Sequence, residues 1–153
     1  MTRHVLFRFF ALLSVTGMLL FAAGANSPLV SQENLSFNDF KFKMKKGEKF
    51  EKSMITDEIK KYVGKRITIR GYIRPSFKQK DLKQFILVRD NMECCFGPGA
   101  MLYDCMIVRM QKGNSTDFTV RPIAVEGEFQ IREFMGPDNK PWAIYQLKGY
   151  KVK

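Results

Sequence analysis

Two stretches of alternating apolar and polar residues, each with a glycine at its centre, constrain the fold most. They are RITIRGYIR over residues 66–74 and IAVEGEFQIRE over residues 123–133. Alternation with a period of two predicts β-strands with one buried face. A glycine inside such a strand, here Gly71 and Gly127, indicates a tight bend or a close backbone approach, as at the corners of barrels.

Three further strands are predicted over residues 84–89, 105–110 and 142–152, and a shift of parity near the end of the last one predicts a bulge at Gly149. The stretch FKFKM, residues 40–44, alternates aromatic residues with lysine and predicts an edge strand. A short helix is expected from the cap Thr56 to the stop Gly64. The fold class is therefore mainly β, a small five- to six-stranded antiparallel OB-like barrel with one short N-terminal helix.

The first 25 residues have the three-part pattern of a secretory signal peptide. Arg3 and Arg8 precede an apolar run from Phe9 to Ala23, and small residues lead to a cleavage point before Asn26. The run is shorter than the roughly 20 residues that a membrane span needs. We therefore predict a signal peptide over 1–25, a linker over 26–35 and the OB-like barrel over 36–153.

The predicted location is the periplasm or the exterior, with no stable membrane span after cleavage. The alternative is anchorage by an uncleaved N-terminal helix.

Cleavage would remove His4, the only histidine. A chain without imidazole lacks a histidine general base, a histidine metal site and a Ser-His-Asp triad. Losing Arg3 and Arg8 would also lower the formal charge from +11 to +9. The sequence therefore predicts a basic protein without enzymatic activity or a cofactor.

All three cysteines lie between two apolar strands, in the stretch ECCFGPGAMLYDC over residues 93–105. In an oxidising compartment, Cys94 or Cys95 is expected to form a disulfide with Cys105, and we favour Cys95–Cys105. One alternative is a thiolate site in which Cys94, Cys95 and Cys105 hold Zn or Cu(I). Another is thiol–disulfide exchange by the remaining thiol, helped by the positive charge of Arg89 and Arg109.

A candidate binding surface follows from basic residues that cluster around the first predicted strand and the loop after it. Its members are Arg66, Arg70, Tyr72, Arg74, Lys78, Lys80 and Lys83. Aromatic and basic residues on a barrel of this class are typical of single-strand binding, but an exported protein meets little nucleic acid. An anionic polymer, lipid headgroups or an envelope protein are the expected partners. The simpler interpretation is that these lysines and arginines only keep the domain soluble.

Three segments resemble a family of exported bacterial envelope proteins of the planctomycete type, defined as a domain of unknown function. They are ITDEIKKYVGKRITIRGYIRP, FILVRDNMECCFGPGAMLYDC and PIAVEGEFQI, and the resemblance covers roughly residues 36–152. It implies a small OB-like barrel behind a signal peptide, without an established activity. Some relatives carry a Cys-x-His-x-Pro stretch, which Cys94 and Pro98 match, whereas Phe96 stands at the histidine position.

The leading hypothesis is a non-enzymatic exported envelope protein whose OB-like barrel binds a ligand or a protein partner. The alternative is a thiolate metal-binding accessory protein of the cell envelope that carries Cu(I) or Zn.

Overall fold

The computed structural model describes residues 33–90, 92 and 100–153. This part of the chain contains six strands and four short helical segments. The strands are β1 Glu33–Leu35, β2 Arg66–Ile73, β3 Gln84–Val88, β4 Cys105–Met110, β5 Ile123–Met135 and β6 Pro141–Val152. The helical segments are the 3-10 turns η1 Phe37–Phe40, η2 Lys52–Met54 and η3 Leu102–Asp104, and the single-turn helix α1 Asp57–Lys60.

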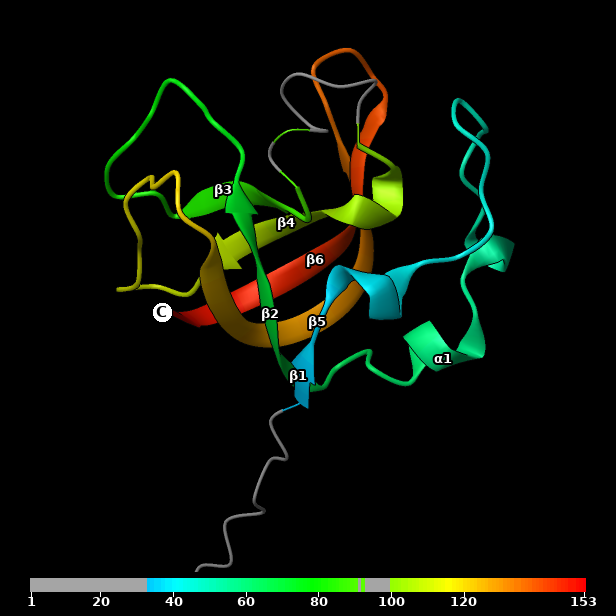
Figure 1. The fold of residues 1–153 in the computed structure, drawn as a ribbon, viewed down its shortest axis with the longest axis horizontal. Coiled ribbons are helices and arrows are strands. Elements are labelled where there is room, and N and C mark those ends of the chain that lie inside the picture. Colours follow the sequence, from blue (N-terminus) through cyan, green and yellow to red (C-terminus); the bar gives the residue numbers. More distant parts are fainter. Residues whose placement is uncertain (1–32, 91, 93–99) are drawn as a thin grey trace, which may run out of the picture.

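The six strands form one mixed sheet in the order β1-β2-β3-β4-β6-β5. The outermost strand β5 also pairs with β2, so the pairings of the five longer strands return to their starting point (Figure 1). Two pairs, β1–β2 and β4–β6, are parallel, and the other four are antiparallel. The prediction of a wholly antiparallel arrangement is therefore wrong, because an alternating pattern carries no information about strand direction.

Five of the predicted strands are confirmed as β2 to β6, and the predicted short helix is confirmed as α1. The predicted strand over residues 40–44 is wrong. Phe40 ends η1, and the next four residues have no regular structure. Their alternation is nevertheless a burial pattern, since Phe40 and Phe42 are buried while Lys41 and Lys43 are exposed.

The strand β1 lies inside the segment 26–35, which was predicted to be a linker. Its residues pair in parallel with β2, and Leu35 lies opposite Ile69. The last three residues of the predicted linker are thus a strand of the sheet, and the domain boundaries stay a prediction. The predicted signal peptide lies outside the described residues and stays a prediction. Among the described helices, none has the length and apolar character that crossing a membrane requires.

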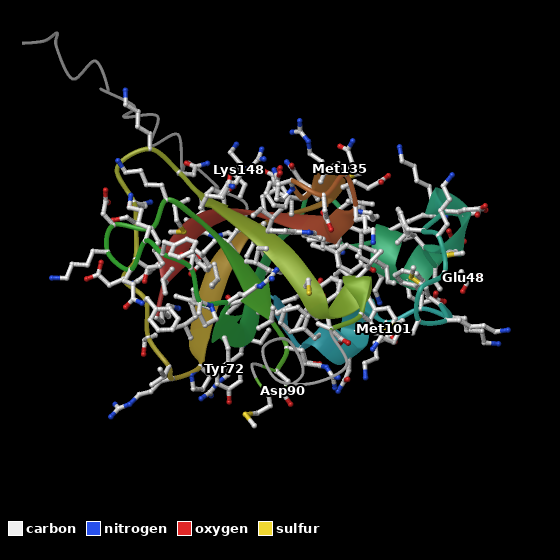
Figure 2. All side chains as sticks on the ribbon, turned by 90° about the horizontal axis from the view of Figure 1, so that it is seen from above. Glu48, Tyr72, Asp90, Met101, Met135 and Lys148 are labelled. Atoms are coloured by element: carbon white, nitrogen blue, oxygen red, sulfur yellow. The ribbon has the colours of Figure 1, made fainter. Side chains whose placement is uncertain are left out.

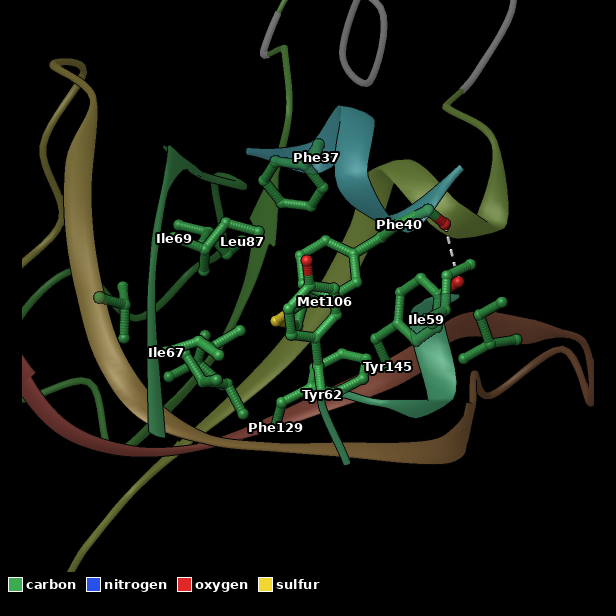
Figure 3. Packing of buried hydrophobic residues seen from close by; sticks show 14 of the residues in the cluster. Phe37, Phe40, Ile59, Tyr62, Ile67, Ile69, Leu87, Met106, Phe129 and Tyr145 are labelled. Carbon is green, nitrogen blue, oxygen red and sulfur yellow. Dashed lines mark hydrogen bonds between the residues drawn. The ribbon is translucent and has the colours of Figure 1, made fainter. Parts of the chain in front are cut away.

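The core lies inside the ring of strands and is closed at one side by η1 and α1 (Figure 3). Three fully buried rings meet at its centre. Phe40 lies 4.8 Å from Phe129 and 5.6 Å from Tyr145, measured between ring centroids. The Tyr145 hydroxyl donates a hydrogen bond of 2.8 Å to the Phe40 carbonyl, so the one polar atom of this cluster is satisfied.

The central glycines of β2 and β5 lie at close backbone approaches, as predicted. A Cβ atom on Gly71 would lie 2.6 Å from the Val88 carbonyl oxygen, and one on Gly127 would lie 2.5 Å from the Lys148 carbonyl oxygen. Beside Gly149, the register between β5 and β6 shifts, since Gly127 pairs with Gly149 and the preceding residue of β5 pairs with Lys151. The predicted bulge thus falls at this point of β6.

Candidate binding surface

The outward-facing side chains of β2 supply the first part of the predicted basic surface. Arg66, Arg70 and Tyr72 alternate along the strand with the buried Ile67, Ile69, Gly71 and Ile73. From Arg66 to Ile73 the strand covers seven residue steps, roughly 23 Å at the usual rise of a strand. The predicted surface therefore starts at Arg66, continues along β2 with Arg70 and Tyr72, and extends beyond the end of the strand.

At one end of β2, Arg66 is already engaged within the protein. Its Nε donates a hydrogen bond of 2.6 Å to Oε1 of Glu126, a carboxylate with only 6% of its surface exposed. The Lys153 ammonium lies 3.7 Å from the other oxygen of Glu126. The Arg66 guanidinium also lies over the Tyr150 ring, 5.0 Å from its centroid. Arg66 therefore serves the packing of β2 against β5 and β6.

Arginines on the outer surface cover aromatic rings at two further places. Arg74 lies over the Trp142 ring at 4.9 Å from the centroid, and the indole Nε1 of Trp142 donates to Oδ1 of Asp138 at 3.1 Å. Arg109 lies over Phe134 at 6.0 Å. Each of these arginines is therefore engaged with an aromatic ring of its own surface.

Beyond β2, the segment 74–83, here called the basic loop, carries the remaining predicted residues. Lys78, Lys80 and Lys83 are all exposed, and between Arg74 and Lys78 lies Phe77, whose side chain is fully exposed. The Ser76 hydroxyl donates a hydrogen bond of 2.7 Å to the Lys78 carbonyl and so stabilises the turn that presents Phe77. Sequence reasoning included these lysines but missed Phe77.

Only one acidic side chain, Asp81, lies in this loop. Its carboxylate is 3.6 Å from the Lys83 ammonium and 4.0 Å from that of Lys78. A hydrogen bond from Ser115 lowers the pKa of Asp81 below its ordinary value, and the charges of Lys83 and Lys78 act in the same direction. Three lysines and one arginine against one carboxylate leave the loop with a net positive charge.

The loop between β4 and β5, residues 111–122, supports the basic loop. Leu82 and Thr116 exchange backbone hydrogen bonds of 2.7 and 3.2 Å, and the Phe118 amide donates to the Gln79 carbonyl at 2.8 Å. The two loops lie side by side at one side of the sheet (Figure 1). Val120 in the second loop is exposed over 74% of its surface and precedes the exposed Arg121. Sequence reasoning did not join these two loops, because they are about 40 residues apart.

Tyr72 and Cys105 belong to a small apolar cluster on the outer side of the sheet. Cys105 begins β4 opposite Val88, and both are buried with Ala143. Tyr72 packs against this cluster from the next strand. Figure 2 shows Tyr72 and Lys148 on opposite sides of the molecule. Because Tyr72 packs against Val88, Cys105 and Ala143, it contributes mainly to packing, although the sequence analysis placed it on the binding surface.

Cys94 and Cys95 lie outside the described residues, so the disulfide and the thiolate metal site both stay predictions. Within 33–90, 92 and 100–153, no group of three or more His, Cys, Asp or Glu side chains is arranged to hold a metal ion. The two arginines expected to favour a thiolate have other contacts. Arg89 forms an ion pair of 2.8 Å with the buried Asp104, and Arg109 donates to Gln84 at 3.1 Å.

The strands and their pairings define a mainly β protein built on a six-stranded mixed sheet. No model of a known protein family matches the chain, and no curated protein matches it. A similar fold occurs in the crystal structure of a DUF3299 family protein from Pseudomonas aeruginosa PAO1. The TM-score is 0.55 and the sequence identity 18%, over 80% of this chain and 95% of that one. This likeness shows a shared fold with a protein from a domain-of-unknown-function family, the kind of family that the sequence resembles.

Proposed function

We propose that this protein is a non-enzymatic component of the cell envelope that binds an anionic polymer, or an acidic protein partner, through the basic loop. The observation that carries this proposal is the concentration of Arg74, Lys78, Lys80 and Lys83 around a fully exposed Phe77. A second loop supports the segment through backbone hydrogen bonds. Exposed positive charge on an ordered loop attracts and orients an anionic partner.

We further propose that the architecture is an OB-like barrel. Support comes from the ring of pairings β2-β3-β4-β6-β5-β2 and from the parallel pair β4–β6. In barrels of this kind, the loop between the first two barrel strands is one of the usual binding segments. The basic loop takes that position, because β2 and β3 would be those two strands.

The absence of an enzymatic role is also a proposal, and the contacts of the partly or fully buried carboxylates support it. Glu126 binds Arg66, Asp104 binds Arg89, and Glu128 accepts a hydrogen bond of 2.9 Å from the Gln130 amide. A general acid or base needs a carboxyl group within reach of a substrate proton. Glu126 and Asp104 thus hold neighbouring segments together, and Glu128 also accepts a hydrogen bond of 3.4 Å from the Tyr150 hydroxyl on β6.

Chromatography on heparin, an anionic polymer, tests the proposal. The double variant Lys78→Gln/Lys80→Gln should elute at clearly lower salt than the wild-type protein, because it lacks two of the exposed charges of the basic loop. The matched control is Lys41→Gln/Lys43→Gln, which removes the same charge from two exposed lysines of another segment. Equal shifts for the two variants would mean that the protein responds to net charge alone, and the proposed site would be wrong.

A further inference from the structure

We infer that the basic loop and the loop between β4 and β5 dock on the surface of an anionic lipid bilayer, with Phe77 inserted among the lipids. This inference rests on the proposed function, since it depends on the same positive charge of the basic loop and adds an anionic lipid surface to the partners of that site. Its experiment separates the two, because insertion of Phe77 is measured independently of the attraction between charges.

Phe77 lies in the turn of the basic loop, between Ser76 and Lys78. Its side chain is fully exposed to water. The other aromatic side chains of the outer surface are covered at least in part, and they are Tyr72, Phe134, Trp142 and Tyr150. The Ser76 hydroxyl bonds to the Lys78 carbonyl, so the turn holds Phe77 in an outward position. An aromatic ring held in water gains free energy when it enters the boundary between headgroups and acyl chains.

The residues around Phe77 carry positive charge. The side chains of Lys78 and Lys83 are 62% and 71% exposed, and Lys80 is exposed as well. Lysine side chains have long apolar stems that lie along an interface while their ammonium groups reach the headgroups. Each such charge near an anionic membrane surface adds to the attraction. The loop thus combines an apolar tip with the charges that an anionic bilayer binds.

The neighbouring loop repeats this combination. Val120 is exposed and is followed by the exposed Arg121, and hydrogen bonds tie this loop to the basic loop at Leu82–Thr116 and Gln79–Phe118. The two loops lie together at one side of the sheet (Figure 1). Each contains an exposed apolar residue followed in the sequence by an exposed cation. Two points of contact restrict the orientation of the protein on a surface more than one does.

The aromatic residues favour a bilayer over single-stranded nucleic acid. Binding of single strands needs several accessible rings on which successive bases stack. Here Arg66 lies over Tyr150, Arg74 over Trp142 and Arg109 over Phe134, and Tyr72 packs in the outer apolar cluster.

The residues beside Phe77 favour a bilayer over a folded protein partner. They are Ser76, Lys78 and Gln79, so Phe77 is the one exposed aromatic group of the loop and its immediate neighbours are polar. The central part of a stable protein interface is more apolar than this and contains few charges.

The experiment uses protein purified from the envelope of cells that express the full-length gene. It is mixed with vesicles of phosphatidylcholine alone or with added phosphatidylglycerol, and bound protein is measured by flotation. We expect binding to the anionic vesicles that weakens with salt. Phe77→Ala should bind them about tenfold more weakly, equivalent to 1.4 kcal/mol, and should be retained on heparin like the wild type. Val63→Ala, which shortens an exposed apolar residue outside the two loops, should bind like the wild type.

Insertion is read directly with Phe77→Trp. Its emission, after subtraction of the wild-type signal from Trp142, should shift to the blue on anionic vesicles and be quenched by brominated lipids. Unchanged emission, or vesicle binding that is insensitive to Phe77→Ala, would overturn the inference, whereas retention on heparin would still support the proposed function. Weaker binding of Phe77→Ala to a single-stranded oligonucleotide, with unchanged binding to vesicles, would also overturn it and would identify nucleic acid as the partner.

Discussion

At the scale of single residues, Gly71 is a point where β2, β3 and η1 meet. An added Cβ atom would lie 2.6 Å from the Val88 carbonyl oxygen and 2.9 Å from the Phe37 ring. The carbonyl belongs to the backbone of a paired strand and cannot move without disturbing that pair. The absence of a side chain at Gly71 is therefore a condition for packing β2 this closely against β3 and η1.

We expect Gly71→Ala to lower the free energy of unfolding by about 2–3 kcal/mol, the usual cost of overpacking a core. Gly47→Ala is the control, because Gly47 has a positive φ of 78° but no atom within 4 Å of an added Cβ. It should cost about 1 kcal/mol through backbone strain alone. Urea unfolding of both variants measures the difference, and a loss no larger for Gly71→Ala than for Gly47→Ala would argue against close packing at Gly71.

A second single residue, Asp81, limits the positive charge of the basic loop. It lies in the left-handed region with φ of 50°, where asparagine, like aspartate, occurs more often than most other residues with a side chain. Asp81→Asn should therefore fold normally and bind heparin about two- to fivefold more tightly, since it removes the negative charge beside Lys78 and Lys83. The measurement is the salt concentration of elution together with the unfolding midpoint. Elution at lower salt would show that Asp81 assists the anion rather than opposing it.

At the scale of elements, one buried hydrogen bond connects the last strand to the start of the described chain. The Tyr145 hydroxyl on β6 donates to the Phe40 carbonyl at the end of η1. Burial raises the pKa of Tyr145 above its ordinary value of 10.0. The neutral hydroxyl is the form that donates this hydrogen bond, so deprotonation and unfolding are coupled.

This coupling gives a pH dependence with a definite sign. As pH rises above about 10, tyrosine in the unfolded chain loses its proton while Tyr145 in the folded protein keeps it. The contribution of Tyr145 is therefore fully present at neutral pH and is lost as pH rises through its folded pKa.

The variant Tyr145→Phe should cost about 1–2 kcal/mol at neutral pH, because the Phe40 carbonyl loses its donor. Its unfolding free energy should then fall less steeply above about pH 10 than that of the wild type. Urea unfolding at a series of alkaline pH values checks both points. Parallel curves for the two proteins would show that Tyr145 is not responsible for the alkaline loss.

The elements also show what the sequence could predict. The strands β2 to β6 were predictable because alternation directly records a buried face. The sequence did not predict the parallel pair β4–β6 or the contact between β2 and β5, since the choice of a partner strand depends on the arrangement of the whole sheet.

At the site, the lysines of the basic loop were predictable as a local cluster. The engagement of Arg66 by Glu126 was not, because these residues are 60 positions apart.

At the scale of the whole molecule, the predicted disulfide depends on the predicted export, because disulfides form in oxidising compartments, so one experiment tests both. A disulfide between Cys95 and Cys105 would close a loop of about ten residues and stabilise the fold by about 2.5–3 kcal/mol in the chain-entropy treatment. Protein taken from the envelope should have the intact mass of a chain that begins at Asn26. Alkylation should modify one cysteine before reduction and three afterwards, and the metal content should be negligible. Three reactive thiols together with stoichiometric zinc or copper would instead support the thiolate metal site.

The parallel pair β4–β6 has a consequence for the order of events during synthesis. Met106 of β4 lies beside Tyr145 of β6, and Arg66 of β2 lies opposite Glu128 of β5. Neither neighbour exists when β2 to β4 leave the ribosome, and contacts between distant segments form slowly. The nascent polypeptide accordingly lacks a finished tertiary structure until its final strand has been translated. A delay of this kind would suit the predicted export, because a translocation pore accepts a chain that is still extended.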